Sequence, residues 1–255
     1  MNAVVLAGGG ADGVSALDPH APNKAFVRIA GTPLVARVLS ALRATPRIER
    51  IVVVAPAAVR DDGALALADE VRDAGPRMLD SLAAGLAGAP PDDAVLIVPA
   101  DLPVLSVAAV DEFLDALAGR ELDVAYAILE RRLHEARYPQ VPHTWARLRD
   151  GTYCGGGLTA LRPRALARLG TFLDALGAAR KSPLRLAGLF GWDVLVRFGI
   201  GNLRVSDAER RATALLGVPA GAIRCTHPEV AVNVDRPSDV ALANELADPT
   251  PKTPA

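Results

Sequence analysis

Short apolar runs recur along the first half of the chain, and turn-forming residues bound each of them. They are rich in valine and alanine, as expected for strands that are buried on both faces of a parallel sheet. We therefore predict strands at residues 3–7, 51–55, 94–98 and 123–127. Helical segments separate them, at residues 33–44, 61–68, 77–88 and 107–118. Strands that alternate with helices indicate a mostly parallel α/β sheet.

This alternation breaks after about residue 128. A basic, turn-rich segment follows at 128–150, and a long helical region is predicted at about 163–217. Strand character returns at "AIRC" (222–225) and "VAVNV" (230–234), before a last helix that Pro237 opens. We interpret residues 1–246 as one domain with an insertion at about 128–217. The Pro/Thr-rich tail, residues 247–255, is expected to be disordered.

Residues 182–203 are apolar and numerous enough to cross a bilayer, but Arg185, Asp193 and Arg197 interrupt them. A membrane span is therefore not expected. We interpret the stretch as helices of a subdomain core or of a dimer face, so a homodimer is a possible assembly. The alternative is a surface that contacts lipid or a lipid acceptor.

Composition excludes several classes of function. The net charge is −1 with both signs scattered, so the chain lacks the basic surface that nucleic-acid binding requires. Its two cysteines have no metal-ligand spacing, which is typical of a reducing compartment. Residues 1–7 have no basic segment before them and no cleavage site after them, so we predict a first strand there and a cytoplasmic location. The histidines also lack metal-ligand spacing and are interpreted as structural or surface residues.

The glycines at 8–13 spell the G-x-G-x-x-G pattern of a dinucleotide-binding turn, but the residues after them do not fit that use. Pro19 and Pro22 stand where the helix that faces the pyrophosphate should run. The acidic residue that should bind a ribose is absent, because no Asp or Glu lies between Asp18 and Glu49. No Lys-Ser/Thr pair follows the glycines, so a P-loop is excluded as well.

Lys24 is the first cationic residue after these glycines. A glycine-rich loop followed by a single lysine can wrap a triphosphate, because backbone N–H groups approach the phosphate oxygens and the ammonium neutralises charge. Asp101 follows a second apolar run and precedes Leu-Pro. Ligands collect at the carboxyl ends of parallel strands, so an oxygen ligand is expected there.

At these residues the chain resembles a known superfamily. "VVLAGGG…NKAFVRIAGTPLVARVLSAL" is similar to the opening of the GT-A-like nucleotidyltransferases, which include the MobA-like NTP transferases and the sugar-phosphate nucleotidyltransferases. Four later segments resemble the superfamily in the same order: "RMLDSLAAGL", "VPADLPVL", "CGGGLTALRP", read as a Gly-Gly turn, and "VAVNVDRPSDVALA". The resemblance implies a mostly parallel, Rossmann-like (GT-A type) three-layer fold with a helical insertion.

The resemblance also implies the site. It places nucleotide contacts at Leu6, Ala7, Gly8, Gly9, Gly10, Lys24, Arg77, Ser81 and Asp101. It places Mg²⁺ between Asp101 and Asp235, with Asn233 as a further ligand, and makes Lys24, Asp101 and Asp235 the catalytic residues. Acceptor contacts are expected at Arg131, Arg132, Gly155, Gly156 and Lys181. Asp239 is interpreted as a residue of the first helical turn and not as a ligand.

Two positions depart from the superfamily pattern. No Arg follows the glycines within "ADGVSALDPHAPN", and Leu158 stands where the glycine turn often continues with Asn. The implied reaction is the Mg²⁺-dependent transfer of NMP from an NTP, either CTP or GTP, to a small phosphorylated acceptor with release of pyrophosphate. A GT-A glycosyltransferase is an alternative, although the chain lacks the D-x-D motif. A catalytically weakened nucleotide-binding regulatory protein is another.

Overall fold

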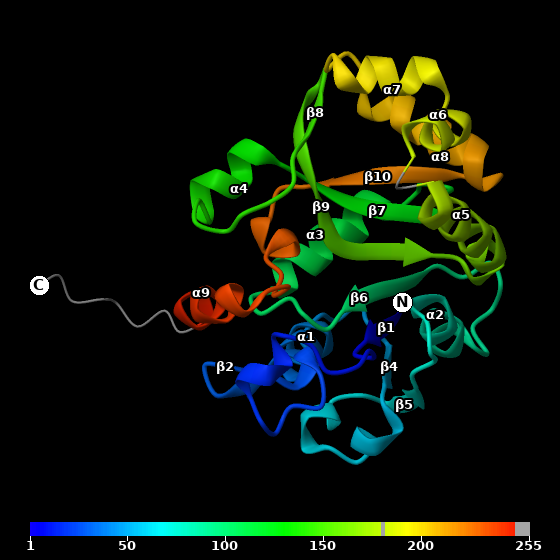
Figure 1. Cartoon of the computed structure of the whole chain (residues 1–255). Helices are drawn as coiled ribbons and strands as arrows, with labels where there is room; N and C mark the ends of the chain where they lie inside the picture. The colour runs from blue at the N-terminus through cyan, green and yellow to red at the C-terminus, as the bar shows by residue number, and fades with distance from the viewer. Residues whose placement is uncertain (180–181, 248–255) are drawn as a thin grey trace, which may run out of the picture.

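The computed structural model describes residues 1–179 and 182–247. Within them, eight strands form one mixed sheet in the order β10-β7-β9-β6-β1-β4-β5, and β8 pairs with β9 (Figure 1). These strands are β1 (Asn2–Leu6), β4 (Arg50–Ala55), β5 (Glu70–Asp73), β6 (Val95–Pro99), β7 (Val124–Glu130), β8 (Ala146–Leu148), β9 (Gly151–Leu161) and β10 (Ala220–Cys225). β9 runs antiparallel to both β6 and β7, and the neighbours along the rest of that order are parallel.

Helices cover both faces of this sheet, as the alternating pattern predicts. On one face, α1 (Leu34–Arg43) and α3 (Val107–Leu117) pack against side chains such as Ala3 and Val5. On the other face, α2 (Met78–Leu86) and the start of α5 (Leu166–Ala179) pack against Val4 and its neighbours. Successive residues of β1 therefore enter different cores. The three-layer α/β fold is confirmed.

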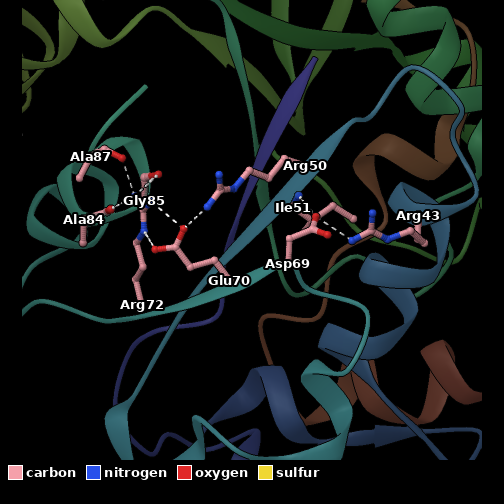
Figure 2. Close-up of polar contacts among 9 residues, drawn as sticks. All are labelled: Arg43, Arg50, Ile51, Asp69, Glu70, Arg72, Ala84, Gly85 and Ala87. Atoms are coloured by element: carbon pink, nitrogen blue, oxygen red, sulfur yellow. Dashed lines mark hydrogen bonds and ion pairs between the residues drawn. The ribbon is translucent and has the colours of Figure 1, made fainter. Parts of the chain in front are cut away.

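The helix predicted at residues 61–68 is wrong. A short 3-10 turn, Gly63–Leu65, stands there, and the chain then adds β5 as an edge strand that pairs with β4. Asp62 accepts the Ala64 N–H at 2.8 Å, which favours a tight turn, and only one of the two leucines, Leu65, is buried. Instead, Asp69 accepts the Ile51 N–H at 2.7 Å and an Arg43 N–H at 2.8 Å, which ties the start of β5 to the sheet (Figure 2).

Arg72 on β5 secures α2. Its guanidinium donates to the last carbonyls of that helix, Ala84, Gly85 and Ala87, at 2.7, 3.1 and 2.8 Å (Figure 2). A cation at this position satisfies carbonyls that no helical N–H reaches and also faces the negative end of the helix dipole. Glu70 holds Arg72 in place, and the hydrogen bond from Arg72 lowers the pKa of Glu70 to about 2.

The second half of the chain differs from two expectations. The glycines at 155–157 lie inside the long strand β9 and not in a turn. Neighbouring side chains leave no room for a side chain at these positions. A Cβ at Gly157, for example, would lie 2.7 Å from a methyl carbon of Leu102. The strand expected at 230–234 is also wrong. A 3-10 turn at Pro228–Ala231 overlaps its start, and Val230 and Val232 pack into separate clusters.

Residues 128–217 supply β9 to the sheet as well as helices. α4 (Arg131–Arg137) follows β7, and α5 leads to α6 (Pro183–Phe190), α7 (Trp192–Gly199) and α8 (Val205–Leu216). In Figure 1, α6, α7 and α8 gather beside β10, far from β5. Gly191, at φ +86°, separates α6 from α7. No helix among the described residues has both the length and the apolar character of a membrane span.

The last described element is α9 (Pro237–Ala247), which packs beside the small hairpin of β2 (Arg28–Ile29) and β3 (Thr32–Pro33). Asp239 accepts the N–H groups of Asp235 and Arg236 at 3.0 and 2.8 Å. It therefore caps the first turn of α9, as expected. Residues 248–255 of the predicted disordered tail lie outside the described residues.

Candidate active site

Three charged residues from distant segments meet at the carboxyl end of the central strands. Lys24 begins a short 3-10 helix, Asp101 lies two residues after β6, and Asp235 precedes α9. The Lys24 ammonium lies 2.6 Å from Asp101 Oδ2 and 2.9 Å from Asp235 Oδ1. The Val234 N–H donates to the Asp101 carbonyl at 3.0 Å, which holds the two acidic segments together. The structure thus brings together all three residues that were predicted to be catalytic.

The two carboxylates differ in their surroundings. The Asp101 side chain is only 12% exposed, whereas that of Asp235 is 58% exposed. Burial raises the pKa of Asp101, and the ammonium of Lys24 only partly opposes this effect. Burial alone would lower the pKa of Lys24, but the two carboxylates more than offset it and raise the pKa. A charged lysine therefore compensates two negative groups at the bottom of the site.

The oxygen atoms of this group fit a magnesium ion. Among the described residues, no three His, Cys, Asp or Glu side chains cluster as a complete metal cage. Mg²⁺ does not need one, because it commonly takes one or two carboxylates together with water and substrate phosphates. Asp101 and Asp235 face one cation, Lys24, from two sides. Asn233 lies next to them and donates its amide N–H to Asp235. These are the residues that could hold the metal beside a bound triphosphate.

The glycine loop after β1 is held in shape by a residue that the sequence reasoning missed. Asn23 is 1% exposed, and its amide donates to the carbonyls of Ala7 at 2.9 Å and Gly9 at 3.1 Å. Its oxygen accepts the Ala25 N–H at 2.9 Å, which caps the short helix that carries Lys24. Asn often caps the start of a helix, so the position of Asn23 directly before Lys24 was the sequence feature that could have identified it. Asn23 therefore couples the position of Lys24 to that of the loop.

The loop offers backbone donors to a ligand. With its carbonyls at Ala7 and Gly9 turned toward Asn23, the N–H groups of Gly8, Gly9 and Gly10 have no hydrogen-bond acceptor within the described part of the chain. Gly9 has φ +102°, a conformation that other residues rarely adopt. Unpaired N–H groups on a glycine loop are a suitable surface for phosphate.

Gly9→Ala should weaken NTP binding at least about tenfold, because the new side chain is incompatible with this backbone conformation and shifts the donors. Titration calorimetry with each NTP would measure this. Gly88→Ala is the matched control, since Gly88 also has a positive φ, +77°, with open space around it and far from the loop. Both variants should lose about 1 kcal/mol of stability. Equal NTP affinity in Gly9→Ala and wild type would contradict a phosphate role for the loop.

The predicted base-contacting segment lies directly against this loop. Ser81 is 7% exposed, and its hydroxyl accepts the Gly75 N–H at 3.1 Å. A Cβ at Gly8 would lie 2.8 Å from Ala74 Cβ and 3.5 Å from Ser81 Oγ. Glycine is therefore required at position 8 for the two segments to approach. Arg77 instead points outward, where it pairs with Asp80 at 3.0 Å.

A cavity of about 500 Å³ opens at the two carboxylates, and Asp101 and Asp235 are among the residues that line it. Gly155 and Gly156 line it, as predicted, together with Tyr126, His143 and other residues that were not singled out. Both glycines lie on β9, where a side chain would overlap Tyr126 or Ala127. The cavity therefore exists partly because β9 carries no side chains at this point.

The cations expected to bind the acceptor are placed differently. Arg131 and Arg132 do not line the cavity; they pair with Glu135 at 2.7 Å and Glu130 at 2.8 Å. Lys181 lies outside the described residues. Arg236, which sequence reasoning missed, does line the cavity, and its guanidinium has no acidic partner among the residues described. The sequence feature that could have identified Arg236 is its position directly after Asp235.

A buried histidine lies behind this cavity. His134 is 0% exposed, packs at 4.4 Å between ring centroids against His143, and has no hydrogen-bond partner for either ring nitrogen in the described chain. Burial, reinforced by His143, lowers the pKa of His134 to about 4. Burial also lowers the pKa of His143. Both rings are therefore neutral near pH 7, and His134 is a structural residue, as expected from the sequence.

This histidine should make the protein sensitive to acid. The unfolded chain binds a proton at His134 near pH 6.5, whereas the folded chain does so only near pH 4, so stability is lost as the pH falls between these values. The loss is on the order of 3 kcal/mol. Unfolding by urea from pH 8 to pH 4 would measure it. His134→Phe should flatten the curve, whereas His20→Phe at an exposed position should not; superimposable curves for wild type and His134→Phe would exclude this role.

Comparison with known proteins gives the family. The model of the MobA-like NTP transferase domain matches residues 3–181. A hypothetical transferase from Thermus thermophilus superposes with a TM-score of 0.82 and 34% identity, over 94% of this chain and 98% of that chain. No curated protein matches the chain significantly.

Two more distant structures share the fold. The 4-diphosphocytidyl-2C-methyl-D-erythritol synthase of Anaerococcus prevotii superposes with a TM-score of 0.59 and 13% identity, over 96% of this chain and 94% of that chain. A CMP:2-keto-3-deoxy-manno-octonic acid synthetase complexed with CTP gives 0.57 and 15%, over 96% and 97%. The family match covers most of the chain and includes the glycine loop, Lys24 and Asp101. The chain therefore belongs to the MobA-like NTP transferase family and is an enzyme of the nucleotidyltransferase type.

Proposed function

We propose that the protein transfers an NMP group from an NTP to a small phosphorylated acceptor, in a Mg²⁺-dependent reaction that releases pyrophosphate. One observation carries this proposal: Lys24 lies between Asp101 and Asp235 at the end of the central strands, beside a glycine loop with unpaired N–H groups. A cavity large enough for a second substrate opens at the two carboxylates.

The reaction requires positioning and charge neutralisation more than covalent chemistry. An oxygen of the acceptor phosphate attacks the α-phosphorus of the NTP. The bond from that phosphorus to the bridging oxygen breaks, and pyrophosphate leaves with the bonding electrons. A Mg²⁺ ion held by Asp101 and Asp235 would neutralise phosphate charge when bound. The glycine loop would hold the phosphates of the NTP, and Lys24 would neutralise charge near the α-phosphorus.

The acceptor phosphate would lie in the cavity beside Arg236. Among the described residues, Arg236 is the Lys or Arg residue that lines this cavity, whereas Arg131 and Arg132 lie outside it and are engaged by glutamates. An arginine is well suited to a phosphate, since its planar fork of N–H groups binds two oxygens at once. Arg236 thus takes the place that the sequence reasoning assigned to the arginines of α4.

The base would lie against the glycine loop and the neighbouring segment that carries Ser81. CTP and GTP are the candidates. Among the structures with this fold, the synthetase described above is complexed with CTP. This favours CTP as the first nucleotide to test.

A screen of the purified full chain tests the proposal. Pyrophosphate release should be measured for each of the four NTPs against phosphorylated sugars, phosphorylated polyols and molybdopterin, with and without Mg²⁺. One NTP and one acceptor class should give turnover that EDTA abolishes. Nucleotide binding without turnover for any acceptor would favour a regulatory protein. Release of a nucleoside diphosphate from a nucleotide sugar would favour the glycosyltransferase alternative.

A further inference from the structure

A second cavity, of about 460 Å³, lies on the sheet beside the acceptor cavity. Its floor is formed by β7, β9 and β10, and its wall by α8 and β8. The side chains that line it are mainly hydrocarbon, including Val124, Ile128, Leu148, Val205, Leu216 and Phe198. It is a distinct feature from the polar cavity that contains Asp101 and Asp235.

Small residues that face one another create this space. On α8, Ala208 and Ala212 stand four residues apart and so point in the same direction from the helix. Ala220, Gly221 and Ala222 stand opposite them on β10. Larger side chains at these positions would close the gap between helix and sheet, as they do elsewhere in the core.

Two of the polar groups that line this cavity are already engaged. Glu209 accepts the Ala222 N–H at 2.8 Å and pairs with Arg120 at 3.3 Å. The Tyr153 hydroxyl donates to the Asp150 carbonyl at 2.8 Å. With these groups occupied by the protein itself, the cavity presents mainly hydrocarbon to an incoming ligand, and it suits an apolar one.

The two cavities adjoin each other. Tyr126, Thr144, Cys154 and Gly155 line both of them. Tyr126 stands at this boundary with its hydroxyl over Gly155, where any side chain on residue 155 would overlap it. A ligand that occupies the acceptor cavity beside Arg236 would enter the apolar cavity by passing the side chain of Tyr126, which is 46% exposed.

The mouth of the second cavity is also apolar. Phe198 of α7 lines the cavity and is 44% exposed. Trp192, Val196 and Ile200, on or next to the same helix, are more exposed still. Their spacing places these three residues on one side of α7 and Phe198 on the other, so Phe198 is the α7 residue that faces the cavity. An exposed aromatic ring at the edge of an apolar cavity is a suitable contact for a hydrocarbon chain.

We propose that the acceptor is an amphiphile, with its phosphate beside Lys24 and Arg236 and a hydrocarbon chain in the second cavity. This inference rests on the proposed function for the identity of the ligand as acceptor. It adds the class of that acceptor: an alkyl or other hydrocarbon chain that carries a phosphate, rather than a sugar phosphate. The occupant is the ligand's chain, and neither a second copy of the protein nor a lipid bilayer is required.

Binding of methyl phosphate and octyl phosphate tests the inference without turnover. Calorimetry of the full chain, below the micelle concentration of octyl phosphate, should show that octyl phosphate binds at least about 100-fold more tightly. Each buried methylene contributes roughly a three- to fourfold gain in affinity. NTP affinity is measured in parallel. Equal affinities for the two phosphates would overturn the inference, whatever the NTP result.

Variants test whether the hydrocarbon chain of octyl phosphate lies in the second cavity. Ala212→Phe and, as a second filling variant, Ala208→Phe should each reduce octyl phosphate affinity at least about tenfold and leave methyl phosphate and NTP affinities unchanged. Ala214→Phe is the matched control, since Ala214 lies on α8 but is exposed and outside the cavity. Octyl phosphate binding that survives in both filling variants would contradict the cavity as its site.

Three further outcomes separate the possibilities. If the ligand-free protein is a dimer and both filling variants dissociate it, the cavity is a subunit interface and the inference is wrong. If octyl phosphate binds as expected but no NTP supports pyrophosphate release, the proposed function fails while the amphiphile site stands. If short phosphorylated sugars react as fast as alkyl phosphates, the proposed function stands and the inference fails.

Discussion

Asp101→Asn is expected to reduce Mg²⁺-dependent turnover at least about 1,000-fold while the protein remains folded. Asp101 is the more buried of the two carboxylates, and it lies 2.6 Å from the Lys24 ammonium. An amide has the same shape but is a poorer ligand for a hard cation. Pyrophosphate release at increasing Mg²⁺ concentration would measure the effect. Asp235→Asn should be milder, because Asp235 is more exposed and Asn233 lies beside it.

The same substitution should have little effect on stability in the absence of metal. Burial raises the pKa of Asp101, so the fold already disfavours its charge, and Lys24 keeps Asp235 as a partner. Asp123→Asn is the matched control, since Asp123 is also buried but pairs with Arg164 at 2.6 Å, away from the cavity. That control should lose stability and retain turnover. Normal activity in Asp101→Asn would exclude the metal assignment, and its unfolding would make Asp101 a structural residue.

Lys24→Met is expected to reduce kcat about 100- to 1,000-fold and to weaken NTP binding much less. The ammonium acts on charge that develops as the bond to pyrophosphate breaks, so its loss is felt most in the transition state. Single-turnover kinetics at saturating NTP, together with calorimetric NTP affinities, would separate the two effects. Lys24→Arg retains the charge and should retain more activity. A normal kcat in Lys24→Met would remove Lys24 from the mechanism.

This variant should also be less stable than wild type when metal is absent, by about 1–3 kcal/mol, since two carboxylates would face each other without a cation. The double variant Lys24→Met/Asp101→Asn should recover most of that loss, because one of the two negative charges is then gone. Denaturant unfolding of the four proteins forms a double-mutant cycle. Additive losses in the double variant would show that the ion pair contributes nothing to the folded state.

Much of the fold follows from local patterns. Continuous apolar runs such as residues 51–55 predict buried strands, and helical spacing at 33–44 predicts α1, because burial on both faces leaves a visible signature in the sequence. Such patterns failed where a segment has few apolar residues. β5 is held by its pairing with β4 and by the Arg72 and Asp69 hydrogen bonds, and pairing with a distant strand leaves no local signature.

The site divides in the same way. Lys24 and Asp101 were selected by residue type and by their places after the glycine loop and after a strand, and Asp235 by the resemblance to the superfamily. The structure brings the three together. Arg131 and Arg132 were also selected for their charge. Charge alone cannot show whether an arginine already has a glutamate partner, and here both do.

The sequence by itself determined the layered α/β fold, the glycine loop and the acidic and basic residues at its edge. Only the tertiary structure decided which neighbours those residues meet. Asn23 reaches back to the carbonyls of Ala7 and Gly9, and β9 inserts between β6 and β7 with its glycines against Tyr126 and Leu102. These contacts join residues far apart in the chain. Periodicity shows which face of a segment is buried, but not what it is buried against.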